Sequence, residues 1–421
     1  MNLAIVIDPL LDGYGDLMFG YKLAQHEAKK DVFENIYLVS YKDDEAAPFF
    51  DKIGLPEGVT YLAKDDFQDW LAASSITVDV LVLGPEQYHH DNHKYYRNAA
   101  GEDCEVFGHT FMDYLDKATP LLLLEEYSYS LDNLQACKEG YETDGFTNVR
   151  LLRTGLEAVT GKDAGIFLDT PRATVGHSAL LDLLAGRDRA EFKKDCVLSI
   201  VYSNDDDFLD LFFRIHQKFA AECCGGKEPK ILIVGKKLDA KQLEEAEALA
   251  GADIVSVEFM PPKALESCYA LADGLGGCTG DQSLSDTLSA GLIPIYDVRA
   301  HKLDVAQSLD EVLGGDNYPF MGSFFGSSRK DTYARRQLML DEYADDEENF
   351  VTAVERAKAT IQQINKDRRY NLYRSVDDVL EDFRCELEKE PTLVWYKQNK
   401  DTNRFAALAL LDVGLHPKDL D

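Results

Sequence analysis

The run from Gly276 to Asp297, GGCTGDQSLSDTLSAGLIPIYD, combines a glycine-rich turn, a short helical pattern and an apolar strand. The first N–H groups of a helix have no partner inside it, and glycine leaves open space beside them. Together with the helix dipole, such N–H groups bind phosphate. The run therefore predicts a site for a phosphorylated ligand. An ordinary βαβ crossover also contains a glycine turn, so a purely structural role stays open.

Five consecutive residues in this run are the candidates for phosphate binding. Gly280 forms the turn, and Asp281 or Ser283 has the residue type of an N-cap. The amides of Gln282, Ser283 and Leu284 would then point outward, toward a ligand. Gln282 and Ser283 can also donate from their side chains, and the Asp281 carboxylate can accept from a ribose or sugar hydroxyl.

The chain is long and strongly acidic. Its 421 residues suffice for two or three domains, each with a core of its own. The 76 acidic residues exceed the 44 basic ones and give a formal net charge of −32, which repels nucleic acid and anionic lipid. We therefore expect no nucleic-acid partner and attribute the acidity mainly to solubility.

The sequence also predicts where the protein works. No stretch reaches the roughly 18 uninterrupted apolar residues of a membrane span, and the start MNLAIVIDPLL lacks the basic segment of a signal peptide. The eight cysteines include no CxxC pair and no histidine at zinc-finger spacing. We expect a soluble, cytoplasmic protein with reduced thiols and no stable membrane insertion.

Apolar strands alternate with helical patterns along the chain. In the first half we expect strands at Leu3–Ile7, Asn35–Ser40, Val78–Leu83 and Leu121–Leu124. In the second half we expect strands at residues 197–202, 230–234, 254–257, 274–277 and 294–296, and helices at about 207–222, 240–250, 262–272, 283–289 and 300–313. Apolar strands without alternation indicate parallel sheets that are covered on both faces.

These elements predict an α/β fold with two Rossmann-like domains. We place the first domain at residues 1–190, the second at 195–330 and a C-terminal helical segment at 331–421. In such sheets ligands bind beyond the carboxyl ends of the strands. The two domains would then face each other across a cleft that holds the ligands.

Two Rossmann-like domains with these motifs resemble the nucleotide-sugar glycosyltransferases of the GT-B fold. The segments that carry the resemblance are VEFMPP (Val257–Pro262), YALAD (Tyr269–Asp273) and GDQSLSDTLSAGLIPIYD (Gly280–Asp297). The resemblance implies that the second domain binds a nucleotide-sugar donor and the first domain an acceptor. It implies no cofactor beyond the donor and no obligatory metal ion.

The loop DGYGD (Asp12–Asp16) is similar to the aspartate-bearing loop of the bacterial protein-arginine rhamnosyltransferases. The Gly-Glu-Asp-Ser donor motif of that family reads Gly280-Asp281-Gln282-Ser283 in this chain, with Asp for Glu and Gln for Asp. This narrower resemblance makes a protein side chain one candidate acceptor. It leaves the sugar undefined.

An inverting sugar transfer needs a base that takes a proton from the acceptor. Asp16 is the first candidate, because it lies in a glycine loop directly after the first strand. Asp12 would orient it or act as a turn residue, and Gly15 would let the backbone approach a substrate. Asp16 could instead be the N-cap of a helix over Leu17–His26. A retaining transfer would need no such base, and the sequence leaves the stereochemistry open.

The departing nucleoside diphosphate needs positive charge or N–H donors, because negative charge develops on it in the transition state. Lys236 and Arg299 follow predicted strands and could supply this charge, or they could be solvated surface residues. Candidates for binding the nucleotide base also follow predicted strands, with packing in the core as the alternative; they are Tyr202, Ser203, Phe259 and Met260.

Two further patterns give weaker signals. His89 and His93 have the i, i+4 spacing of zinc ligands, but no glutamate follows His89, and we expect no metal site there. Asp205, Asp206 and Asp207 resemble the DxD metal motif of the other glycosyltransferase fold. They begin a predicted helix, so N-capping explains them better.

The sequence thus predicts a metal-independent glycosyltransferase that uses a nucleotide-sugar donor. Two alternatives stay open. A nucleotide-sugar epimerase of the same fold would need acid and base residues around the sugar. A noncatalytic nucleotide-binding or protein-interaction module would need neither.

Overall fold

The structure is a computed structural model that describes residues 1–7, 14–84, 92–97, 103–108, 110–125, 131–157, 163–169, 171, 195–297, 303–313 and 347–389. Contacts between residues divide the chain into two compact units. Unit 1 consists of Met1–Glu125, Ser130–Leu152 and Tyr373–Asp421, and unit 2 of Glu126–Tyr129 and Arg153–Leu372. This division differs from the sequence-based boundaries at 190, 195 and 331, because unit 2 already begins at Arg153 and the chain returns to unit 1 after residue 372.

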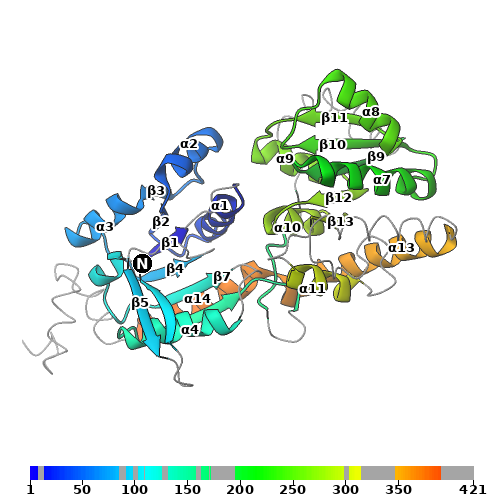
Figure 1. Ribbon diagram of the computed structural model, residues 1–421. Helices are drawn as coiled ribbons and strands as arrows, with labels where there is room; N and C mark the ends of the chain where they lie inside the picture. The colour runs from blue at the N-terminus through cyan, green and yellow to red at the C-terminus, as the bar shows by residue number, and fades with distance from the viewer. Residues whose placement is uncertain are drawn as a thin grey trace, which may run out of the picture. The chain divides into compact units, whose positions relative to one another are not determined.

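Unit 1 contains a six-stranded sheet in the order β3-β2-β1-β4-β7-β8 (Figure 1). Its strands are β1 (Asn2–Ile7), β2 (Asn35–Ser40), β3 (Val59–Ala63), β4 (Val80–Leu83), β7 (Leu121–Glu125) and β8 (Val149–Arg153). The pairs β1–β2, β1–β4, β2–β3 and β4–β7 are parallel. Strands β4 and β7 are buried along their whole length, as expected for a sheet with both faces covered.

Helices pack on both faces of this sheet. They are α1 (Gly15–Ala28), α2 (Asp43–Ile53), α3 (Lys64–Ala72), the short 3-10 helix η1 (Thr110–Tyr114) and α4 (Leu131–Thr143), and a separate antiparallel pair consists of β5 (Asn92–Arg97) and β6 (Asp103–Gly108). On one face, Phe67, Phe111 and Tyr141 join Ala4 and Val6 in one core cluster. On the other face α1 lies so close that a Cβ at Gly20 would be 2.7 Å from Cγ2 of Ile7.

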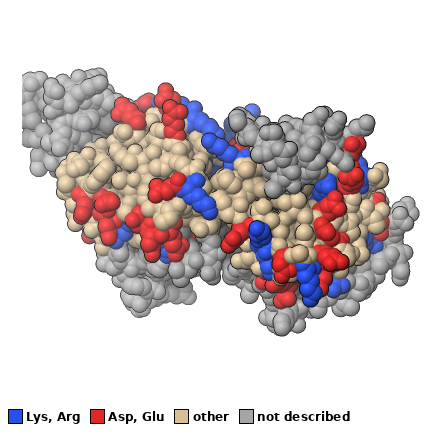
Figure 2. Space-filling model, turned by 90° about the horizontal axis from the view of Figure 1, so that it is seen from above, with Lys and Arg blue, Asp and Glu red and all other residues tan. Residues whose placement is uncertain are grey.

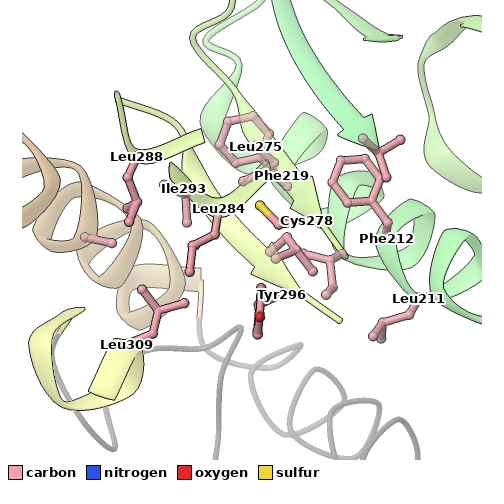
Figure 3. Close-up of a cluster of buried hydrophobic side chains, with 14 of the residues drawn as sticks. Leu211, Phe212, Phe219, Leu275, Cys278, Leu284, Leu288, Ile293, Tyr296 and Leu309 are labelled. Atoms are coloured by element: carbon pink, nitrogen blue, oxygen red, sulfur yellow. The ribbon is translucent and has the colours of Figure 1, made fainter. Parts of the chain in front are cut away.

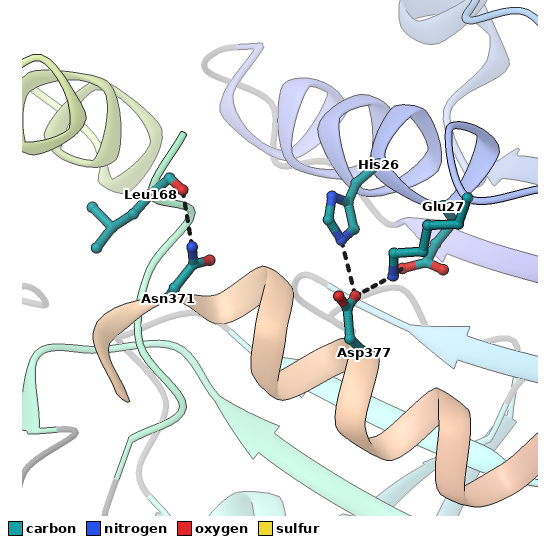
Figure 4. Close-up of polar contacts among 6 residues, drawn as sticks. His26, Glu27, Leu168, Asn371 and Asp377 are labelled. Carbon is teal, nitrogen blue, oxygen red and sulfur yellow. Dashed lines mark hydrogen bonds and ion pairs between the residues drawn. The ribbon is translucent and has the colours of Figure 1, made fainter. Parts of the chain in front are cut away.

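Helix α14 (Leu372–Lys389) brings the end of the described chain back onto unit 1. Its buried residues recur every three or four positions; they are Leu372, Tyr373, Val376, Leu380, Phe383 and Leu387. Asp377 accepts a hydrogen bond from His26 of α1 at 2.9 Å (Figure 4). Arg150 of β8 pairs with Asp382 and Glu386, each at 2.8 Å.

Unit 2 contains a five-stranded sheet in the order β11-β10-β9-β12-β13 (Figure 1). The strands are β9 (Cys196–Tyr202), β10 (Glu228–Val234), β11 (Asp253–Val257), β12 (Leu275–Cys278) and β13 (Ile293–Tyr296). All four neighbouring pairs are parallel. This is the 3-2-1-4-5 order of the Rossmann type, so the predicted doubly wound domain is confirmed.

The helices of unit 2 connect these strands. They are α7 (Asp206–Cys223), α8 (Ala240–Ala250), α9 (Pro262–Tyr269), α10 (Asp281–Ser289), α11 (Leu303–Leu313) and α13 (Glu347–Ile364). Figure 3 shows part of the core, in which Leu284 and Leu288 of α10 lie near Leu275, Ile293 and Tyr296. The helix over 240–250 matches its prediction, and the others differ by a few residues at their ends.

Two consecutive glycines of β12 show how closely the helices pack on both faces of this sheet. Successive strand residues point to opposite faces. A Cβ at Gly276 would lie 2.2 Å from Cγ2 of Thr287 in α10, and a Cβ at Gly277 would lie 2.4 Å from Cγ2 of Val201 and 3.0 Å from the ring of Phe212 in α7. These two glycines are therefore required by packing, not by the approach of a ligand.

Surface charge fits the composition of the chain. On the face drawn in Figure 2, acidic and basic side chains lie interspersed. No described helix has the length and apolar character that a bilayer crossing requires.

His216 of α7 is a buried histidine in the core of unit 2. Its Nδ1 donates to the carbonyl oxygen of Ala250 at 3.1 Å, and within the described chain its Nε2 has no partner. Burial lowers the pKa of His216 from 6.5 to about 4. This side chain is therefore neutral in the folded protein at pH 7 and stays so well below that pH.

This depressed pKa predicts a loss of stability in mild acid. Between the two pKa values the unfolded chain binds a proton that the folded chain does not bind. The free energy of unfolding of unit 2 should therefore fall by about 2 kcal/mol between pH 7 and pH 5 because of His216. Urea unfolding at both pH values should show a smaller loss for His216→Gln than for the wild type. Equal losses in the two proteins would contradict this assignment.

Candidate ligand-binding site at the start of helix α10

The strand order of unit 2 reverses between β9 and β12. Chain segments that leave such neighbouring strands diverge and open a crevice at the carboxyl ends, where ligands of doubly wound sheets bind. Here the segment before α10 is fixed against the end of β9, because Oγ1 of Thr279 after β12 donates to the carbonyl oxygen of Tyr202 in β9 at 3.1 Å. Helices α7 and α10 both begin here, so two helix starts are candidates for an anion.

The start of α10 is open. Its N-cap is Gly280, which has no side chain to cap the helix, and a Cβ there would meet nothing within 4 Å. Ser283 turns back, since its Oγ accepts from the N–H of Gly280 at 3.1 Å and donates to the carbonyl oxygen of Gly280 at 2.8 Å. In the described chain, the backbone N–H groups of Gln282 and Ser283 have no acceptor. Two N–H donors thus remain for a ligand.

The predicted third donor is engaged. The N–H of Leu284 donates to the carbonyl oxygen of Gly280 at 3.0 Å, and its side chain is fully buried. Of the three amides that the sequence predicts to point toward a ligand, those of Gln282 and Ser283 therefore remain available. Leu284 contributes to the core, where it joins the cluster around β12 and β13.

Asp281 supports the helix start from inside the unit. Its Oδ1 accepts a hydrogen bond from the phenol of Tyr296 at 2.7 Å, and the two residues are 9% and 0% exposed. This bond links the first residue of α10 to β13. The carboxylate thus holds the start of α10 in place, whereas the sequence pointed to contact with a sugar hydroxyl.

Gln282 has one polar atom that is not satisfied. Its Nε2 donates weakly to Oδ1 of Asp286 at 3.4 Å, whereas its Oε1 is buried without a hydrogen-bond partner in the described part of the chain. Buried polar atoms are nearly always paired in folded proteins. Gln282 therefore has a hydrogen-bond acceptor with unused capacity in the first turn of α10.

The start of α7 is closed and acidic. The side chain of Asp205 accepts a hydrogen bond from the N–H of Phe208 at 2.9 Å, which confirms the predicted N-cap. Asp206 and Asp207 follow in the first turn. An aspartate cap uses the N–H groups and adds negative charge, so α10 offers the better anion site of the two.

The other predicted residues of unit 2 lie at the same edge of the sheet with different degrees of exposure. Lys236 follows β10 and pairs with Asp206 of α7. Ser203 is 2% exposed and its Oγ accepts from the N–H of Asp205 at 3.0 Å, so it shapes the turn. Met260 is buried and its sulfur lies 3.5 Å from that of Cys268, which places it in the core. Tyr202 and Phe259 are partly exposed.

Asp16 lies at the corresponding edge of unit 1. Helix α1 begins at Gly15, with Tyr14 as its N-cap, so Asp16 is the second residue of the helix and not its cap. The residue as a whole is 8% exposed. The sheet order of unit 1 reverses between β1 and β4, and Asp16 follows β1. Asp12, Arg299 and His89 lie outside the described residues.

A cluster between α1 and α14 could hold a metal ion by its ligand types. Ligand atoms of His26, Glu27 and Asp377 lie within 4.8 Å of one another. The ammonium of Lys30 donates to both carboxylates, at 2.8 Å for Glu27. Burial raises the pKa of Glu27, whereas hydrogen bonds from His26 and Lys30 outweigh burial and lower the pKa of Asp377. Lys30 supplies the positive charge here, so we assign the cluster to the attachment of α14.

Sequence reasoning misses two features of the site. The bond between Tyr296 and Asp281 joins residues 15 positions apart and has no local pattern. The pair of Lys236 and Asp206 joins two loops that only the parallel order of β9 and β10 brings together. The sequence shows Gly280 before α10 and Asp205 before α7, which predicts the two helix caps. It does not predict these two tertiary contacts.

Comparisons with known proteins concern the fold. The sequence matches no protein-family model and no curated protein. Among solved structures, the chain is similar to the spinosyn rhamnosyltransferase SpnG complexed with thymidine diphosphate, at 11% identity over 86% of this chain and 96% of that one, with a TM-score of 0.46. Apo UGT2 of Phytolacca americana is similar at 10% identity over 91% and 99% of the chains, with a TM-score of 0.49. A protein described as a UDP-N-acetylglucosamine 2-epimerase of Listeria monocytogenes is similar at 9% identity over 92% and 97%, with a TM-score of 0.43.

Proposed function

We propose that this protein is a nucleotide-sugar glycosyltransferase of the GT-B type, which moves a sugar from a nucleoside-diphosphate donor to an acceptor. The observation that carries the proposal is the open start of α10 at the strand reversal of unit 2. There Gly280 leaves space, and the N–H groups of Gln282 and Ser283 lack acceptors among the described residues. A diphosphate is the ligand chemistry that such a helix start fits.

The same groups would assist the transfer. When the bond between the sugar and the diphosphate breaks, negative charge grows on the leaving phosphate oxygen, and fixed N–H donors stabilise that charge. The helix start requires no metal ion for this purpose.

Asp16 is the proposed base, and Asp12 is the candidate for orienting it. In an inverting transfer, the acceptor nucleophile attacks the anomeric carbon, its proton passes to the base and the nucleoside diphosphate departs. Asp16 lies after the central strand β1 at the edge where ligands of such sheets bind. Within the proposal, the acceptor is unidentified, and a protein side chain is one candidate.

The proposed role of Asp16 predicts that its replacement lowers turnover and leaves diphosphate binding unchanged. Asp16→Asn should bind a nucleoside diphosphate as tightly as the wild type, because the residue belongs to unit 1 and the diphosphate site to unit 2. Its transfer rate should fall by a factor of roughly 10² to 10⁴, the usual contribution of a general base. Calorimetric titration and a product assay measure the two quantities. Wild-type turnover in this variant would exclude Asp16 as the base.

A donor panel tests the proposed function as a whole. Thermal shift measurements with UDP-, GDP-, dTDP- and ADP-sugars should identify at least one donor, and product analysis should then show slow hydrolysis of that donor without an acceptor. Conversion of the donor to its epimer would support an epimerase instead. The absence of any shift would favour a noncatalytic interaction module.

A further inference from the structure

Three consecutive aspartates follow β9, the strand that pairs with β12 before the proposed diphosphate site. Asp205 caps α7, and Asp206 and Asp207 occupy its first turn. The contact between Thr279 and Tyr202, at 3.1 Å, joins the segment before α10 to the end of β9, and α7 begins four residues after β9. A diphosphate at α10 would therefore meet the negative charge of α7 unless a cation compensates it.

Lys236 is a described cation that is placed to do this, because it pairs with the first turn of α7. The segment that carries it follows β10, the neighbour of β9, and the N–H of Ser203 donates to the carbonyl oxygen of Val234 at 2.9 Å. The ammonium of Lys236 donates to Oδ1 of Asp206. The Lys236 side chain is 19% exposed and that of Asp206 is 79% exposed, so the lysine stem is held by the protein while the carboxylate is solvated.

We propose that Lys236 is a positioning residue that neutralises the acidic start of α7 and thereby allows an anion to bind at the start of α10. This proposal rests on the proposed function, and it assigns the effect of Lys236 to Asp206 and not to a direct phosphate contact. Salt at physiological ionic strength screens the repulsion between Asp206 and a bound diphosphate only in part. Loss of the lysine should therefore weaken binding of a diphosphate by about five- to tenfold.

A double-mutant cycle separates these two modes of action. Calorimetric titration at low salt would use the nucleoside diphosphate among UDP, dTDP, GDP and ADP that binds the wild type most tightly. The variants are Lys236→Met, Asp206→Asn and the double variant. Lys241→Met is the matched control, because it removes the same charge from an exposed lysine of α8.

Lys236→Met should raise the dissociation constant five- to tenfold, and Asp206→Asn should bind at least as tightly as the wild type. The double variant should return to within about twofold of the wild type, since it loses one positive and one negative charge and so keeps the wild-type net charge at the start of α7. The effect should shrink in 0.5 M salt, whereas a loss of folding would not depend on salt in this way. Lys241→Met should stay within twofold.

A double variant that binds as weakly as Lys236→Met would overturn the proposal, because the lysine would then act independently of Asp206. Equal affinity of Lys236→Met and Lys241→Met would overturn it too. If the wild type binds none of the four nucleotides at millimolar concentration, the proposed function itself fails, and the inference fails with it. The cycle therefore distinguishes a wrong role of Lys236 from a wrong site.

Discussion

Gly280→Asp should abolish most of the affinity for a nucleoside diphosphate while leaving the protein at least as stable as the wild type. The backbone at Gly280 has φ −148 and ψ 170, which any residue can adopt, and a side chain there meets open space. Aspartate is a favoured N-cap and should stabilise the helix by a few tenths of a kcal/mol. The same carboxylate would occupy the N–H groups of Gln282 and Ser283 and repel a phosphate.

The expected loss of affinity is roughly 100-fold, since two hydrogen bonds to a charged ligand contribute about 1.5 kcal/mol or more each. Gly280→Asn is the matched control, because it introduces a cap of the same size without charge and should lose less affinity. Titration calorimetry and thermal unfolding measure the two effects. Undiminished binding in Gly280→Asp would remove the start of α10 from the site. The opposite signs expected for affinity and stability exclude misfolding as the cause.

Gly277→Ala should strongly destabilise unit 2. The new Cβ would lie 2.4 Å from Cγ2 of Val201 and 2.8 Å from its Cβ, both on the adjacent strand, and 3.0 Å from the ring of Phe212. Neither neighbour can withdraw, because Val201 and Phe212 are fully buried in the core of the unit. Overpacking of this kind costs about 2 to 3 kcal/mol.

Chemical denaturation measures this cost. Gly15→Ala is the matched control, because Gly15 is the first residue of α1 and a Cβ there meets nothing within 4 Å. The control should change the free energy of unfolding by less than about 0.5 kcal/mol. A Gly277→Ala protein as stable as the control would mean that β12 does not pack between α7 and α10 as described.

Much of the fold follows from local sequence patterns. Runs of four or more apolar residues, such as LAIVI and LLLL, lie in buried parallel strands, as expected for a sheet with two covered faces. The strand Val59–Ala63 is not predicted, because polar Thr60 interrupts its apolar pattern. The sequence predicts parallel sheets of the Rossmann type but not the position of each strand, since strand order depends on contacts between distant segments.

The position of α14 shows a second limit of prediction from sequence. The sequence predicts a helical segment after residue 331 but not the apolar face that Val376, Leu380 and Phe383 form, and such a face does not by itself identify the surface that it covers. The contacts of Asp377 with His26 and Lys30, and of Asp382 with Arg150, place α14 on unit 1. These ion pairs join residues more than 200 positions apart, and no spacing rule reports them.

The candidate site also combines features that local sequence predicts with contacts that it does not predict. The glycine before α10 and the aspartate before α7 are local signals, and they distinguish an open helix start from a capped one. The inward turn of Asp281 toward Tyr296 is tertiary, so an aspartate that resembles a ligand residue in sequence instead supports the helix.

A crystal structure of the protein with its tightest-binding nucleoside diphosphate tests the central claim most directly. The account predicts diphosphate oxygens at about 3 Å from the backbone nitrogens of Gln282 and Ser283, the normal length of an N–H···O hydrogen bond. A diphosphate bound elsewhere, without a hydrogen bond to either N–H group, would contradict it.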